Sequence, residues 1–79
     1  MSLDDLVLQR CRDVVEDTTL DWDGDLYDAG LDSIGLLELS AILSADAGVD
    51  VTISDLFDCA TPGAVARFLH RRASAPSTS

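Results

Sequence analysis

The sequence contains no lysine, and its only basic side chains are five arginines and one histidine. None of these lies between Asp13 and Asp58, a stretch that holds thirteen of the fifteen acidic residues in a chain of net charge -10. The negative electrostatic potential of this stretch repels nucleic acid phosphates and anionic lipids, so neither nucleic acid nor a membrane is an expected partner. It would attract a protein with a basic patch, increasing the encounter rate more than the final affinity.

Long apolar runs are also missing. No run reaches the roughly 18 to 20 residues that span a bilayer, and the acidic start of the chain does not fit a secretion signal, so a cytoplasmic protein is expected. Its two cysteines, Cys11 and Cys59, are predicted to be reduced and buried, with a single disulfide as the alternative. A chain of 79 residues forms one small domain, which cannot enclose a large active site.

Apolar residues recur at three- and four-residue spacing in separate segments, which predicts an all-α fold. We expect a domain over residues 1–72, with helices at about 2–17, 33–47, 54–58 and 62–72, and a disordered tail over 73–79. Either Asp32 or Ser33 can cap the second helix, and Gly48 can end it. Val49, Val51 and Ile53 alternate, but one isolated strand has no partner, so this segment is interpreted as an extended loop.

A long connection over residues 18–32 joins the first two predicted helices. A connection of this length in so small a domain is usually ordered for a reason. Four of its residues are expected to anchor it to the core: Leu20, Trp22, Leu26 and Tyr27.

The stretch GLDSIGLLEL, Gly30 to Leu39, places Ser33 beside Asp32 at the start of an apolar helix. A nucleophile elbow needs G-x-S-x-G, but Leu31 stands where the first glycine belongs. A catalytic triad also needs a base, and nothing in the sequence brings the single histidine, His70, to Ser33. A minimal hydrolase is therefore disfavoured.

Metal binding has little support in the sequence. Asp21, Asp23 and Asp25, with Asp32 at the twelfth place, resemble a calcium loop, but Leu26 stands where the sharp turn requires glycine. The two cysteines and the histidine lack the paired spacing of a zinc site.

A serine that is modified remains as the hypothesis. At a helix start, Ser33 would be exposed and surrounded by partial positive backbone charge, which accommodates a phosphate ester. The alternative is a small acidic interaction module in which Ser33 is only a helix cap.

The stretch LYDAGLDSIGLLEL resembles the signature of acyl and peptidyl carrier proteins. In that family a G-x-D-S-[LI] element places a serine at the start of the second helix, and a glutamate follows five residues later, here Glu38. The similarity continues through VDVTI, DLFD and TPGAVARFL and covers Leu3 to Leu69. It implies a four-helix bundle of carrier-protein type, with three main helices and a short third one.

The resemblance also implies a function. A phosphopantetheinyl transferase would attach 4'-phosphopantetheine from coenzyme A to Ser33, and the thiol of this arm would hold acyl or aminoacyl groups as thioesters. The carrier itself would not be an enzyme. Its further partners would be acyltransferase, adenylating or ketosynthase-type enzymes with basic and apolar docking patches.

The third and fourth helices resemble those of polyketide and nonribosomal peptide carriers, which suggests specialised biosynthesis. A discrete aryl, D-alanyl or fatty-acid carrier is the alternative. We expect a stand-alone monomer.

The second helix has more apolar residues than one buried stripe requires, so Leu36 or Leu37 is expected to be partly exposed. Leu36→Arg is expected to weaken transfer without unfolding the protein. The residues predicted to dock partners are Asp28, Asp32, Ile34, Leu36, Leu37, Glu38, Ile53 and Asp55.

Overall fold

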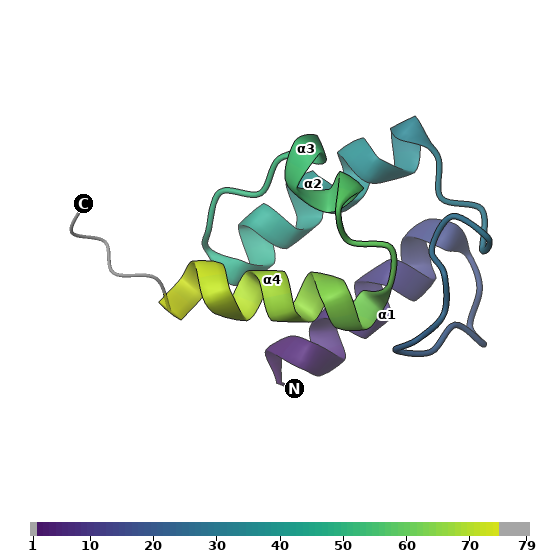
Figure 1. Ribbon diagram of the computed structural model, residues 1–79, viewed down its shortest axis with the longest axis horizontal. Helices are drawn as coiled ribbons and strands as arrows, with labels where there is room; N and C mark the ends of the chain where they lie inside the picture. Colours follow the sequence, from purple (N-terminus) through teal and green to yellow (C-terminus); the bar gives the residue numbers. More distant parts are fainter. Residues whose placement is uncertain (1, 75–79) are drawn as a thin grey trace.

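The computed structural model describes residues 2–74, in which four helices pack into a bundle (Figure 1). Helix α1 spans Leu3–Val15, α2 spans Ser33–Ala47, α3 spans Ile53–Phe57 and α4 spans Pro62–Ser74. Helix α1 packs against both α2 and α4, and α3 packs against α2. Residues 2–74 contain no strand, and the predicted all-α fold with three main helices and a short third one is confirmed.

Helices α1 and α4 both end at residues other than those predicted. Ser2 caps α1, because its Oγ accepts a hydrogen bond from the Asp5 backbone N–H at 3.2 Å. Glu16 then adopts a left-handed conformation with φ of 55°, which ends α1 at Val15, earlier than predicted. Helix α4 continues to Ser74, so the tail predicted over 73–79 begins with two helical residues. The rest of that tail lies outside the described residues.

Helix α3 begins at Ile53, one residue before the predicted start, because Thr52 and Asp55 form a capping box. The Asp55 N–H donates to Thr52 Oγ1 at 3.2 Å, and the Thr52 N–H donates to Asp55 Oδ2 at 3.0 Å. Before it, the segment predicted as an extended loop is held to α2 by Ser44, whose Oγ bonds both the N–H and the C=O of Val51. No part of this segment pairs as a strand.

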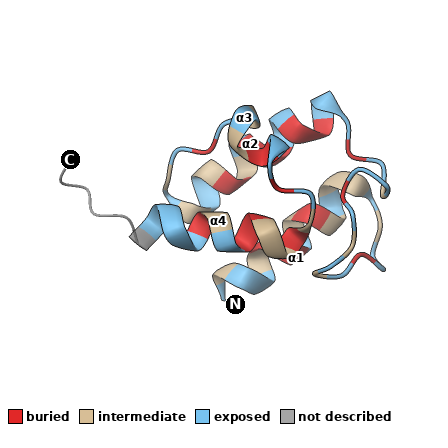
Figure 2. Cartoon of the chain, in the orientation of Figure 1, coloured by how far each residue is buried: buried red, intermediate tan, exposed pale blue. Residues whose placement is uncertain are grey.

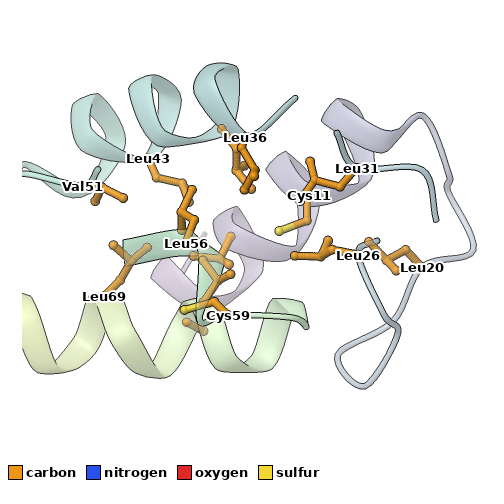
Figure 3. Packing of buried hydrophobic residues seen from close by; sticks show 14 residues of the cluster. Cys11, Leu20, Leu26, Leu31, Leu36, Leu43, Val51, Leu56, Cys59 and Leu69 are labelled. Atoms are coloured by element: carbon orange, nitrogen blue, oxygen red, sulfur yellow. The ribbon is translucent and has the colours of Figure 1, made fainter. Parts of the chain in front are cut away.

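One hydrophobic core joins the four helices and the connection between α1 and α2 (Figures 2 and 3). Cys11 and Cys59 are both buried and unbridged, as predicted. Burial raises the pKa of Cys11 to about 12, with Cys59 adding to the effect, and burial also raises the pKa of Cys59. Both thiols are therefore protonated and poorly reactive near neutral pH. Among the described helices, none has the length and apolarity needed to cross a membrane.

The connection between α1 and α2 is anchored by Leu20 and Leu26, which are buried, and by Trp22, which is half-buried. The expectation for Tyr27 is wrong, because this residue is 38% exposed. Leu31 takes its place in the core instead. A loop lacks the regular period that identifies the buried face of a helix, so its sequence does not distinguish these residues.

Hydrogen bonds to backbone carbonyl oxygens tie the same connection to α1, to α4 and to the segment before α4. Arg12 Nε donates to the Leu20 carbonyl oxygen at 2.7 Å, which ties the connection to α1. The Gly63 N–H donates to the Trp22 carbonyl oxygen at 3.0 Å, and the Leu26 N–H donates to the Ala60 carbonyl oxygen at 2.8 Å. The segment that leads into α2 is thus fastened to three other parts of the fold.

Candidate functional site

Ser33 is the first residue of α2 and is exposed to solvent. The cap of the helix is Asp32, whose Oδ1 accepts a hydrogen bond from the Gly35 N–H at 2.8 Å. No hydrogen bond joins the Ser33 hydroxyl to any of residues 2–74. Of the two residues that the sequence leaves open for the cap, Asp32 therefore has this role, and the exposed Ser33 keeps its hydroxyl accessible for chemistry.

Two glycines help to place Ser33. Gly30 has φ of 112°, a conformation that side chains with a Cβ rarely adopt, and its N–H donates to the Tyr27 carbonyl oxygen at 3.1 Å. Gly35 is buried where the first turn of α2 approaches α1. A Cβ at Gly35 would lie 2.8 Å from Leu31 Cδ1 and 3.2 Å from Val14 Cγ1. The positive φ of Gly30 therefore sets the turn that leads toward α2, and the missing side chain of Gly35 lets the start of α2 lie close to α1.

The surroundings of Ser33 fit a phosphodiester. The backbone N–H groups of Ser33 and Ile34 have no acceptor within residues 2–74, as expected for the first turn of a helix. Unpaired N–H groups and the helix dipole favour an anion at this end of α2. The Asp32 carboxylate is also close, but its Oδ1 is engaged by the Gly35 N–H.

Two of the residues predicted for docking are exposed apolar side chains of α2: Ile34 is 70% exposed and Leu37 is 58% exposed. The acidic residues Asp28, Asp32 and Glu38 are also exposed. Helix α2 holds no basic residue that could neutralise them. The exposed start of α2 thus combines apolar side chains with negative charge.

The predicted docking role of Leu36 is wrong. Leu36 is only 2% exposed and belongs to the core (Figure 3). Its neighbour Leu37 is exposed to solvent instead. The expectation that Leu36→Arg leaves the protein folded fails for the same reason, because the change would bury an unpaired charge. Two other predicted residues are less available than expected: Ile53 and Asp55 are half-buried, and the Asp55 carboxylate binds Thr52 and Arg72.

Phe57 was not identified from the sequence as a surface residue. It is the last residue of α3 and is 60% exposed. The short helix buries Leu56 one position earlier, so Phe57 points to a different side. A five-residue helix gives too few apolar positions to show a period, and only the packing of α3 on α2 reveals which residues face outward.

His70 does not belong to the surroundings of Ser33. Its Nε2 lies 2.6 Å from Asp4 Oδ1, an exposed contact that joins α4 to α1. Residues 2–74 also hold no cluster of three or more histidine, cysteine or acidic side chains arranged to bind a metal ion. The arrangement around Ser33 therefore offers an accessible hydroxyl at a helix start without a neighbouring histidine base.

Comparison with known proteins assigns a family to this arrangement. A search of the curated proteins found no match to the chain. The family described as "Phosphopantetheine attachment site" matches residues 5–69. This range includes all of α2, with Ser33 at its start, all of α3, and most of α1 and α4. The chain therefore belongs to the phosphopantetheine-attachment family, whose members carry covalently bound 4'-phosphopantetheine.

Proposed function

We propose that this protein is a carrier in specialised biosynthesis of the polyketide or nonribosomal peptide kind, with its 4'-phosphopantetheine on Ser33. The observation that carries the attachment to Ser33 is the position of this residue, which is exposed at the start of α2 while Asp32 caps the helix. The pathway class rests on the resemblance of the third and fourth helices to those of polyketide and nonribosomal peptide carriers. When attached, the prosthetic group supplies a thiol on a long arm, which holds acyl or aminoacyl cargo as a thioester. The protein positions this arm and catalyses no step.

Attachment requires a phosphopantetheinyl transferase and coenzyme A. The Ser33 Oγ attacks the pyrophosphate phosphorus that bears the pantetheine, a P–O bond of the pyrophosphate breaks, and the adenosine bisphosphate leaves. In this proposal the proton of the hydroxyl passes to a base of the transferase, and His70 takes no part because it contacts Asp4 instead. The backbone N–H groups at the start of α2 favour the negative charge of the product.

Partner enzymes dock on the exposed start of α2 in this proposal. Ile34 and Leu37 would enter an apolar depression of the partner, while Asp28, Asp32 and Glu38 would face basic residues around it. Acyltransferase, adenylating and ketosynthase-type enzymes with such patches are the expected partners besides the transferase. Charge complementarity supports this choice, since the chain has no basic residue between Asp13 and Asp58.

The experiment is intact-mass analysis after incubation with coenzyme A, magnesium and a broad-specificity phosphopantetheinyl transferase. The parent protein should gain the mass of one phosphopantetheine, and Ser33→Ala should gain none. Ser54→Ala is the matched control, because Ser54 is another exposed serine near a helix start, and this variant should be modified like the parent. No mass gain in folded parent protein, with two different transferases, would instead support the acidic interaction module.

A further inference from the structure

Helix α3 is too short to be stable alone. Its five residues form little more than one turn, and nucleation of so short a helix is unfavourable in water. The Thr52–Asp55 capping box and the burial of Leu56 hold it from its own side. Contacts from other elements must fix its position relative to α2 and α4.

Arg72, in the last turn of α4, makes such contacts. Its Nη1 donates to the Asp50 carbonyl oxygen at 3.3 Å, and its Nη2 donates to Asp55 Oδ1 at 3.5 Å. The two acceptors lie on either side of Thr52, the cap of α3. The planar guanidinium thus binds the segment before α3 and the first turn of α3 together, which a lysine ammonium could not reproduce in the same geometry.

Phe68 and Asp55 orient the Arg72 guanidinium at this contact. The Arg72 Cζ lies 5.0 Å from the centre of the Phe68 ring, one turn earlier on α4, and this stacking limits the orientations of the guanidinium. Asp55 uses its two oxygens differently, since Oδ2 accepts from the Thr52 N–H while Oδ1 accepts from Arg72. We name this group, Arg72 with Asp50, Asp55 and Phe68, the Arg72 bridge.

A comparison with the neighbouring Arg71 shows that this contact is specific to Arg72. Arg71 is the adjacent residue of α4, carries the same charge, and makes no hydrogen bond or ion pair with residues 2–74. A position in the last turn favours either arginine through the helix dipole. The dipole therefore explains the presence of a cation but not the two directed contacts to the start of α3.

We propose that Arg72 is a positioning residue for partner docking: through the Arg72 bridge it holds α3, with its exposed Phe57, in place beside α2. The inference rests on the proposed function, because it assigns to α3 a share of the surface that a phosphopantetheinyl transferase contacts. Phe57 and the exposed residues of α2 lie on helices that pack on each other. Movement of α3 would change the shape of this combined surface without altering Ser33.

The test compares Arg72→Ala with Arg71→Ala, two variants that lose the same charge from neighbouring positions. Hydrogen exchange of the backbone amides of residues 53–57 should become about tenfold faster in Arg72→Ala and stay at the parent rate in Arg71→Ala. In the transferase reaction, Arg72→Ala should raise KM for the carrier about threefold to tenfold with kcat unchanged, because Ser33 and its helix are untouched. Loss of general stability would instead speed exchange in all four helices.

Equal exchange in the two variants would overturn the Arg72 bridge. Faster exchange in α3 with an unchanged KM would overturn its role in docking. If the transferase does not modify the parent protein, the proposed attachment of the arm is overturned. The exchange measurement would still decide whether the Arg72 bridge holds α3.

Discussion

Helices α1 and α2 are similar in length and pack together, but they distribute their apolar residues differently. In α1 the apolar side chains gather on the side that faces α2 and α4, and charged residues of both signs occupy the opposite side. Helix α2 is apolar around most of its circumference and has only two charged residues, Glu38 and Asp46. It fills the core with Leu36, Leu39 and Leu43 and still exposes Ile34 and Leu37.

The difference between α1 and α2 shows which apolar residues the core requires and which it does not. One apolar stripe is enough to join a helix to the core, as α1 demonstrates. The exposed apolar residues of α2 contribute little to that core and lie in its first turns, beside Ser33. Exposed apolar surface flanked by acidic residues indicates contacts with other proteins, and its position next to the proposed attachment serine agrees with a carrier.

The largest effect concerns thiol reactivity. The cysteine of α1, Cys11, is buried with a pKa of about 12 against an ordinary 9.0, which lowers its thiolate fraction about a thousandfold. The unmodified native protein should therefore react very slowly with an aromatic disulfide reagent, and the modified protein should gain one fast thiol, that of the arm. Stopped-flow absorbance with an unfolded control, which exposes both cysteines, measures this. Fast labelling of the native unmodified protein would show that the interior opens readily.

The pair Leu36 and Leu37 tests the comparison within α2 itself. Leu36→Ala should lower the free energy of unfolding by about 2 to 5 kcal/mol, because it leaves a cavity in the core. Leu37→Ala should change it by less than about 0.5 kcal/mol. The same Leu37→Ala variant should raise the KM of the transferase about fivefold, the loss expected for an interface contact of roughly 1 kcal/mol. Urea unfolding and initial rates give both numbers, and equal losses of stability would contradict the assignment of faces.

The next pair separates the cap of α2 from its reactive residue. Asp32→Ala should cost about 1 kcal/mol of stability, because the Gly35 N–H loses its acceptor, yet the variant keeps the hydroxyl and should reach full modification at long times. Ser33→Ala should change stability by less than about 0.5 kcal/mol and abolish modification. A larger loss of stability in Ser33→Ala than in Asp32→Ala would show that the serine caps the helix.

The smallest effect is a pH dependence at helix ends outside α2. The hydroxyl and N–H of Thr19 lower the pKa of Asp17 beneath its ordinary 3.8, and the N–H and hydroxyl of Thr52, with Arg72, lower that of Asp55. Since both pKa values are depressed by folding, this stabilisation is complete above the ordinary pKa and is lost as pH falls through the folded values. Carboxyl NMR titrations should show Asp17 moving back toward 3.8 in Thr19→Ala, and unchanged titration would refute the bond.

The sequence predicted the fold well where its patterns are regular. Apolar spacing located α1, α2 and α4, and the role of Gly48 at the end of α2 followed from residue type alone. The end of α1 was placed too late, because the left-handed conformation of Glu16 has no signal in a residue that is neither glycine nor asparagine.

The candidate site was predicted in part. The position of Ser33 at the start of α2 followed from the motif, but two ambiguities remained for physical reasons. Asp32 and Ser33 are both good caps, and only the backbone path after Gly30 selects Asp32. Leu36 and Leu37 are identical side chains in a helix that is apolar on nearly all sides, so only the positions of α1 and α3 determine which one is buried.

The most direct test of the central claim is the location of the arm. The parent protein, after reaction with coenzyme A and the transferase, should be cut beside acidic residues and the peptide that contains Ser33 analysed by tandem mass spectrometry. We predict that the phosphopantetheine mass is confined to Ser33, while Ser40, Ser44 and Ser54 are unmodified. The same mass on another serine, or on none, would contradict the account.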